Sequence, residues 1–279
     1  MDTAIPDSLH SISAPDLGAR MGGPGSPVLL DVRRTPAYDA AALTLPGALR
    51  CAPEDVTAQA ERLRGKSVVA FCVHGHEVSQ NAAQALRNAG IDALFLAGGI
   101  EGWRAAGLPV MGKLPDCGVP AAPGKPSRWM TRERPKIDRI ACPWLIRRFI
   151  DPGAEFFYVP AEQVAARAAV AGAIPYDVPD VRFSHRGDGC SFDALVADFG
   201  LRDDCLDALA RIVRGADTGK LELTPQSAGL LAISLGLSVT HEDDHAMLAT
   251  GMLVYDALYA WLKAARDEVH NADLFTKTR

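Results

Sequence analysis

Residues 67–79 read SVVAFCVHGHEVS, and they decide the fold of the first part of the chain. The run SVVAF is short and apolar, as in a buried strand, whereas the following SQNAAQALRNAG carries apolar residues at helical spacing and ends on a glycine. Two more strand candidates, VLLDV from Val28 and ALFLAG from Ala93, lie on either side. Short strands that alternate with helices predict an α/β fold, with a parallel sheet flanked by helices on both faces.

The composition is that of an ordinary globular protein. The 279 residues are 48% hydrophobic and 23% charged, which suits two domains with cores of their own. A net charge of -5 gives no broad attraction to nucleic acid or to an anionic membrane. The longest apolar run, from Ala228, is too short to span a bilayer, and the first residues lack the features of a signal peptide. The six cysteines include no C-x-x-C pair. We expect a cytoplasmic protein with reduced thiols and no membrane partner.

A stretch rich in proline and glycine, GKLPDCGVPAAPGKPS, divides the chain. It predicts a first domain at 1–112, a linker at 113–128 and a second domain at 129–279. The second part offers three short strand candidates, RWMT, EFFYV and VRFSH, but helical patterns dominate it. These are DRIACPWLIRRFI, AEQVAARAAVAG, CSFDALVADFG, DDCLDALARIVRG, TPQSAGLLAISLG and a long final helix from about His241 to Glu268. The second domain is therefore predicted to be mainly α-helical, of α+β type.

Cys72 is the candidate nucleophile of the first domain. It follows the strand SVVAF and precedes a helix, so loop N–H groups and a helix N-terminus are expected to point at its sulfur. Both features favour the thiolate and lower the pKa of a cysteine. The alternative is an inert cysteine packed at the end of a strand.

The first 112 or so residues resemble a rhodanese domain. The segments that carry the resemblance are LDVR at 30–33, LPGA at 45–48, the loop of Cys72, GGIEGW at 98–103 and GLPV at 107–110. The resemblance implies a sulfurtransferase in which Cys72 takes a sulfur atom from thiosulfate or a persulfide and passes it, as its own persulfide, to a thiol or a cyanide-like acceptor. No cofactor is required for such a transfer.

The resemblance also implies which residues bind the sulfur substrate. They are the six-residue loop, Val73, His74, Gly75, His76 and Glu77 after Cys72, together with Asp31 and Arg33. The sequence departs from the family pattern at Glu77, where an arginine or another group suited to an anion is usual. A carboxylate there repels the thiosulfate dianion, and a persulfide carried by a protein or a small thiol is compatible with it.

From Trp129 to the end, the chain resembles the C-terminal domain of the chromate-resistance protein family. The matching segments are DRIA at 138–141, WLIRRFID at 144–151, FSH at 183–185 with the following GDGCSFD, and DDH at 243–245 with YDALY at 255–259. The resemblance implies a link to chromate. In the family's regulators a nucleic-acid-binding segment precedes this domain, and here a rhodanese-like segment takes its place, so we do not expect nucleic acid as a partner.

Charged residues on apolar elements of the second domain suggest a pocket. Asp138, Arg139 and Arg147 lie on a predicted helix whose other positions are apolar, which suits either a tetrahedral oxyanion such as chromate or a buried network of ion pairs. Cys142 and Cys190 are candidate reductants or soft ligands there, and the alternative for both is packing in the core.

The stretch HEDDH at 241–245 matches the zinc-protease pattern H-E-x-x-H, but no third ligand follows it, so a metalloprotease is not expected. His245 is instead predicted to face inward. A divalent metal is predicted in this domain, held by a set of carboxylates and imidazoles: His185, Asp217, Glu242, Asp244 and His245. The leading hypothesis is thus a sulfurtransferase coupled to a domain that handles a metal or an oxyanion. The alternative is a sensor or binding protein that responds to chromate or an oxidant without turnover.

Overall fold

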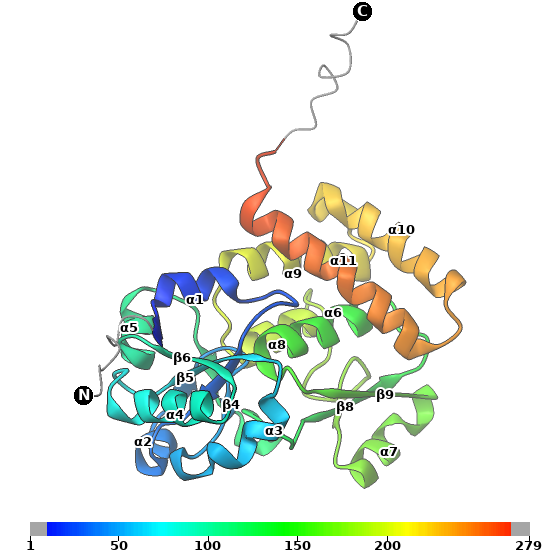
Figure 1. Ribbon diagram of the computed structural model, residues 1–279. Coiled ribbons are helices and arrows are strands. Elements are labelled where there is room, and N and C mark those ends of the chain that lie inside the picture. The colour runs from blue at the N-terminus through cyan, green and yellow to red at the C-terminus, as the bar shows by residue number, and fades with distance from the viewer. Residues whose placement is uncertain (1–9, 269–279) are drawn as a thin grey trace, which may run out of the picture.

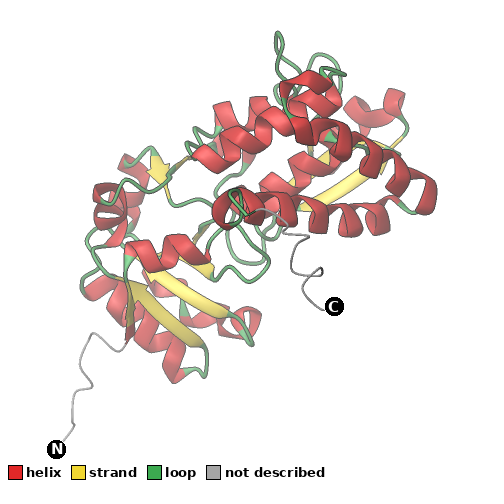
Figure 2. Ribbon diagram, turned by 90° about the horizontal axis from the view of Figure 1, so that it is seen from above, coloured by secondary structure: helices red, strands yellow, loops and turns green. Residues whose placement is uncertain are grey.

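The computed structural model describes residues 10–268, so the ends of the predicted domains, 1–9 and 269–279, lie outside the described residues. Two lobes lie side by side, each with strands of its own (Figures 1 and 2). The first lobe contains the candidate cysteine. The second contains the longer helices, including α10 and α11 at the top of Figure 1.

The first lobe is built on a parallel sheet, as predicted. Its strand order is β1-β6-β5-β2-β4, and every pairing is parallel. The strands are β1 (Ser11–Ile12), β2 (Val28–Asp31), β4 (Leu49–Arg50), β5 (Ser67–Phe71) and β6 (Asp92–Leu96). The strand of the opening stretch, β5, lies in the middle of the sheet. The residue that follows it is therefore held at a central position on the carboxyl edge, where parallel sheets bind ligands.

Helices cover both faces of this sheet (Figure 1). One face packs on α1 (Ala14–Arg20) and α5 (Gly99–Ala105), which contribute Leu17 and Trp103 to the core. The other face packs on α3 (Ala60–Leu63) and α4 (Glu77–Asn88). The shorter elements are α2 (Thr35–Ala40), the 3-10 turns Pro53–Asp55 and Thr57–Gln59, and the antiparallel pair β3 (Leu43–Thr44) and β7 (Met111–Gly112). The alternation of apolar runs predicted these layers because each run is buried on both sides.

The second lobe is α+β. A parallel sheet has the order β10-β8-β9, formed by β8 (Arg128–Arg132), β9 (Glu155–Val159) and β10 (Ile174–Pro175). The predicted strand VRFSH is wrong, since only Phe183 makes an isolated bridge, to Tyr176. The 3-10 turn Ala161–Gln163 and α7 (Val164–Ala171) follow β9, and α7 packs on one face of the sheet through Val164 and Ala168.

Helices cover the other face and form most of the lobe. They are α6 (Asp138–Leu145), continued by a π-helical turn at Ile146–Ile150, α8 (Ser191–Asp198), α9 (Asp204–Asp217), α10 (Pro225–Thr240) and α11 (Asp244–Ala264). Two 3-10 turns, Pro115–Cys117 and Leu221–Leu223, complete the elements. The apolar run from Ala228 lies in α10, and no helix among residues 10–268 is long and apolar enough to cross a membrane.

The predicted final helix, from about His241 to Glu268, runs from Asp244 to Ala264, so it begins three residues later than expected. α10 ends at Thr240, and α11 begins at Asp244 after a new cap, because the Asp243 side chain accepts a hydrogen bond from Ala246 N at 2.7 Å. An aspartate at this position is a preferred N-cap, and it starts the helix inside the HEDDH stretch. The two histidines of HEDDH therefore do not share a helix.

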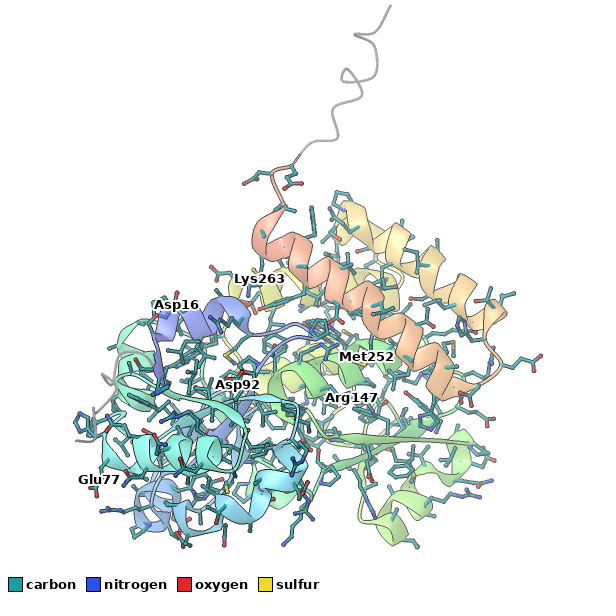
Figure 3. All side chains as sticks on the ribbon, viewed as in Figure 1. Asp16, Glu77, Asp92, Arg147, Met252 and Lys263 are labelled. Atoms are coloured by element: carbon teal, nitrogen blue, oxygen red, sulfur yellow. The ribbon has the colours of Figure 1, made fainter. Side chains whose placement is uncertain are left out.

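The predicted linker packs against the first lobe and connects directly to the second. Arg50 N donates to Ala121 O at 2.8 Å. The lobes also bond to each other, since Gly47 N donates to Phe149 O at 2.7 Å. Lys263 of α11 reaches the end of α1, where its Nζ lies 3.2 Å from Met21 O (Figure 3). These contacts hold the two lobes against each other across the segment that the sequence marks as a boundary.

Candidate functional site

Cys72 lies at the carboxyl end of β5, and its loop leads directly into α4 at Glu77. Backbone N–H groups that follow the turn at Gly98 and Gly99 donate hydrogen bonds to this loop. Ile100 N donates to Cys72 O at 3.0 Å, and Glu101 N donates to Val73 O at 3.1 Å. The start of α5 thus fixes the backbone around the cysteine.

Gly75 closes the loop at a position that only glycine fits. Its φ is 73°, in the left-handed region, and a Cβ there would lie 2.5 Å from Leu96 O and 2.6 Å from Gly98 N. Gly99 is equally constrained, since its Cβ would lie 2.5 Å from Cys72 O. The glycines at 75 and 99 are therefore required because the backbone of the loop contacts the backbone of the turn between β6 and α5.

The Cys72 thiol is surrounded by hydrogen-bond donors. It is 7% exposed, and its Sγ lies 3.2 Å from Ser79 Oγ on the first turns of α4. Burial raises the pKa of this thiol, but hydrogen bonds from the Ser79 hydroxyl and from the N–H groups of Ser79, His74 and Gly75 lower it by more, so that the pKa lies below its ordinary value. The loop therefore favours a thiolate, which is the reactive form of cysteine.

A pocket of about 240 Å³ opens over this sulfur. The residues that line it are Arg33, Arg34, Ala37, Cys72, Val73, His74, His76, Glu77 and Val78. The rings of His74 and His76 are 5.9 Å apart, and both residues are exposed at the rim. Glu77 is exposed as well (Figure 3). The mouth of the pocket thus carries one carboxylate and the exposed guanidinium of Arg34.

Asp31 and Arg33 form a buried ion pair beside the pocket. Arg33 Nη2 lies 2.5 Å from Asp31 Oδ2, and Thr44 Oγ1 donates to the same carboxylate at 2.9 Å. The predicted substrate-binding role of Asp31 is wrong in this structure, because the carboxylate is fully buried and does not line the pocket. Arg33 does line it, with its guanidinium engaged by Asp31.

A second cluster of polar side chains lies at the carboxyl edge of the sheet in the second lobe. His185 Nε2 lies 3.1 Å from Asp217 Oδ2, 3.4 Å from Asp177 Oδ1 and 3.7 Å from Asp138 Oδ2. The three carboxylates come from the first residue of α6, from the loop after β10 and from the last residue of α9. The predicted neighbours His185 and Asp217 are therefore close together, and they are joined by Asp138 and Asp177.

Burial and mutual repulsion dominate the electrostatics of this cluster. Asp138 is fully buried, and its carboxylate accepts hydrogen bonds from Ser191 N and Phe192 N at the start of α8. Burial first, then the charges of Asp217 and Asp177, raise the pKa of Asp138 well above its ordinary value. Burial and Asp177 likewise raise the pKa of Asp217. Like charges thus crowd into a space with little water.

Comparison with known proteins identifies both lobes. Residues 13–106 match the family model of the rhodanese-like domain, and residues 129–262 match that of the ChrB C-terminal domain. The chain joins a rhodanese-like domain to a ChrB C-terminal domain. A curated relative, Protein ChrB of Cupriavidus metallidurans, is 34% identical over 180 residues, which are 64% of this chain and 51% of the relative. The chain therefore spans about half the length of the curated relative that it matches.

Solved structures similar to the chain each cover little more than a third of it. A full-length protein from Lactobacillus plantarum is 30% identical, covering 38% of this chain and 89% of its own, with a TM-score of 0.35. A rhodanese-related protein from Thermoplasma volcanium is 25% identical. The match covers 36% of this chain and 96% of that protein, with a TM-score of 0.32. A thiosulfate sulfurtransferase from Pseudomonas aeruginosa is 28% identical. The match covers 36% of this chain and 19% of that protein, with a TM-score of 0.32.

Three residues of these sites escaped the sequence reasoning. In the rhodanese-like domain, Ser79 contacts the sulfur from seven residues downstream, and Arg34 lines the pocket beside the predicted Arg33. The signal for Ser79 was its place in the first turns of the helix that follows the loop. In the ChrB C-terminal domain, Asp177 adopts a φ of 51°, and no sequence pattern marks that turn.

The HEDDH residues lie apart from the cluster. His245 is exposed and packs edge-on against the Tyr158 ring at 5.4 Å, so the prediction that it faces inward is wrong. Asp244 accepts a hydrogen bond from Arg134 N at 3.1 Å, and Glu242 is exposed. Among residues 10–268, the group of three or more side chains with metal-ligand spacing is Asp138, Asp177 and His185, which includes none of 242–245.

The predicted oxyanion residues are divided between different partners. Arg139 Nε lies 3.3 Å from Asp177 Oδ2. Arg147 donates to Ala154 O at 3.2 Å and contacts Met252 Sδ at 3.7 Å (Figure 3). Of the two readings left open by the sequence, the contacts of Arg139 are those of an ion-pair network.

The two buried cysteines of the ChrB C-terminal domain have no sign of reactivity. Burial raises the pKa of the Cys142 thiol well above its ordinary value, and the nearby Asp138 and Asp177 add to this. Burial and Asp138 also raise the pKa of Cys190. Both thiols are fully buried, so they are protonated core residues and the predicted reductant role finds no support in their surroundings.

Proposed function

We propose that this protein is a sulfurtransferase in which the Cys72 thiolate carries the sulfur. The observation that carries the proposal is the environment of its sulfur: a pocket above, Ser79 Oγ at 3.2 Å and the loop N–H groups beside it. Donors that stabilise a thiolate also suit the terminal sulfur of a persulfide, which bears the same negative charge. No cofactor is needed for either step.

The reaction consists of two displacements at sulfur. The Cys72 thiolate attacks the outer sulfur of the donor, the donor's S–S bond breaks, and sulfite or a thiolate leaves with the electron pair. A nucleophilic acceptor, cyanide or a thiolate, then attacks the outer sulfur of the Cys72 persulfide. The new bond forms as the cysteine thiolate is released, so thiocyanate or a new persulfide leaves and the enzyme is regenerated.

The charge at the pocket mouth favours a persulfide over thiosulfate as the donor. Glu77 lies at the rim of the pocket. The charge of Arg33 is neutralised by Asp31. Arg34 also lines the pocket, and within residues 10–268 it forms no ion pair with a carboxylate. The Glu77 charge opposes a dianion and has little effect on a donor of low charge. Glu77→Gln is accordingly expected to raise kcat/KM for thiosulfate several-fold and to leave that for a neutral persulfide donor unchanged. An equal effect on both donors would contradict this reasoning.

We further propose that the ChrB C-terminal domain links this activity to chromate or to a metal. Its family match and the curated relative, Protein ChrB, support the connection with chromate resistance. Chromate binding is tested by titrating the protein with chromate and with sulfate, a tetrahedral dianion of similar size. Saturable binding of chromate that sulfate does not match is expected.

Sulfur transfer from thiosulfate and from a small-molecule persulfide, with cyanide or a thiol as acceptor, tests the enzyme proposal. Cys72→Ser is the essential variant, and Cys51→Ser, at another buried thiol of the same domain, is the matched control. Turnover that is lost in the first variant and kept in the second is expected. Absence of Cys72-dependent turnover with both donors would leave a sensor or binding protein as the function.

A further inference from the structure

We propose that Asp138, Asp177 and His185, with Asp217 as a fourth group, bind a divalent metal ion in the second domain. The four side chains converge at the carboxyl edge of the β10-β8-β9 sheet, where α6 begins and α9 ends. This inference is independent of Cys72, which belongs to the other lobe.

The distances suit one ion. One ligand atom from each of Asp138, Asp177 and His185 lies within 4.8 Å of the others. His185 Nε2 is 3.1 to 3.7 Å from an oxygen of each of the three carboxylates. Ligands at about 2.1 Å from a common ion lie roughly 3.0 to 3.4 Å from each other. Small movements of the His185 loop are enough to complete such a geometry.

The charge of the cluster calls for a cation. Arg139 and Arg132 approach Asp177, at 3.3 and 3.7 Å. In contrast, Asp138 and Asp217 pair with His185 and, within residues 10–268, with no lysine or arginine. A buried carboxylate without a cation is costly, and a divalent ion bound by both would remove that cost.

A row of buried hydroxyls on the sheet of the same domain is a separate sign of a polar ligand. Thr131 Oγ1 is buried without a hydrogen-bond partner, and Tyr158 OH and Tyr176 OH are buried with only each other as partner. Thr131 is in register with Tyr158, and Tyr176 N donates to Met130 O, so the three lie across neighbouring strands. Buried hydroxyls are nearly always satisfied, so this row points to a polar occupant such as water or an oxygen ligand.

The hydroxyl row lies on the face of the sheet that packs against α6. Trp129 and Tyr176 pack in the core that includes α6, and strand alternation puts Thr131 on the face of Trp129. Asp177 directly follows Tyr176 in the chain.

The ligand set selects the class of metal. Three carboxylates and one imidazole supply oxygen and nitrogen donors, which suit Mn²⁺, Fe²⁺ or Zn²⁺ and do not suit Cu⁺. Asp138 can bind an ion while it keeps its hydrogen bonds from α8, since each carboxylate oxygen has two lone pairs. His185 is 45% exposed, so an ion has a path of entry.

Metal binding is tested on the full chain carrying Cys72→Ser, stripped with a chelator and titrated with Mn²⁺ by EPR and calorimetry. The serine removes the thiolate that would otherwise bind added metal. We expect one Mn²⁺ per chain, displaced by Zn²⁺, and a loss of affinity of at least about tenfold in His185→Ala. His245→Ala, an exposed histidine of the same domain, is the matched control and should bind like the parent.

Melting temperature gives a second measurement that separates binding from folding. Mn²⁺ is expected to raise the melting temperature of the parent and of His245→Ala by similar amounts, and that of His185→Ala by clearly less at the same concentration. The shift caused by Mn²⁺ is measured for each variant against its own metal-free form, so that a change in folding stability does not count as a change in binding. The proposal is overturned if neither Mn²⁺ nor Zn²⁺ binds saturably, if His185→Ala binds as well as the parent, or if His245→Ala weakens binding equally.

Discussion

Replacement of Ser79 by alanine should raise the pKa of Cys72 and slow its reactions near neutral pH. The Ser79 hydroxyl lies 3.2 Å from Cys72 Sγ and also 3.2 Å from His76 O. It has one hydrogen, which it donates to the carbonyl when the cysteine is protonated and to the sulfur when the cysteine is ionised. The hydroxyl thus stabilises the thiolate selectively, and its removal should favour the thiol.

The magnitude follows from the strength of a hydrogen bond to a charged group. Such a bond contributes about 1.5–3 kcal/mol, and one pKa unit corresponds to about 1.4 kcal/mol. Because His76 O competes for the same hydrogen, the lower end applies, and we expect the Cys72 pKa to rise by about one unit. Well below that pKa the thiolate fraction falls about tenfold, while its greater basicity recovers about a factor of three. Alkylation of Cys72 should therefore slow roughly threefold.

Rates of iodoacetamide alkylation from pH 5 to 10, followed by mass spectrometry of the Cys72 peptide, measure this pKa. In the parent, the rate should rise with pH through a midpoint below that of an ordinary thiol, because the folded loop stabilises the thiolate. Ser67→Ala, at an exposed serine at the start of β5, is the matched control. An unchanged midpoint in Ser79→Ala, or an equal shift in both variants, would refute the reasoning.

Three further outcomes follow from the contacts. Gly75→Ala should lower the free energy of unfolding in urea by at least about 3 kcal/mol, because its Cβ would meet backbone atoms. Gly65→Ala, at a similar φ with open space around it, should lower it by about 1–2 kcal/mol. Equal losses would show that the loop can adjust. Asp256→Ala should cost about 3 kcal/mol by the same measurement, since it leaves the half-buried Arg148 without the carboxylate that lies 2.8 Å from its Nη2. A loss under about 1 kcal/mol would show that the pair is unimportant for stability. Cys142 should resist alkylation until the protein unfolds, and labelling of the native chain would contradict its burial.

The sequence predicted most of the fold of the first domain because its signals are local. The apolar strand before Cys72, the helix after it and the two glycines at 98–99 act on neighbouring residues, and they lead directly to the loop. Family resemblance then assigned the nucleophile. Glu77 belongs to α4, two residues before the helix was expected to begin, which is an ordinary error for a helix end.

The cluster of the second domain could be predicted only in part. His185 and Asp217 were chosen because each ends or follows an element, and they do meet. Asp177 escaped because its position depends on a left-handed turn, and Asp138 was assigned to a different pocket. The local pattern of HEDDH misled because Asp243 caps the final helix, which therefore begins inside the stretch and leaves His241 outside it.

Periodicity also failed to identify the buried side of α10. This helix buries Ser227, Ser234 and Ser238, whereas Val239 is 85% exposed. Neither apolar content nor spacing reveals such an arrangement, because the helix is apolar on nearly every side and only tertiary packing selects the face.

The mass of the Cys72 peptide after incubation with a sulfur donor tests the central claim most directly. The native chain is treated with thiosulfate or with a small-molecule persulfide, freed of excess donor and digested without reductant. We expect a gain of one sulfur atom on the Cys72 peptide alone, which is lost on addition of cyanide with formation of thiocyanate. A Cys72 that gains no sulfur from either donor, or a gain that persists elsewhere in Cys72→Ser, would contradict it.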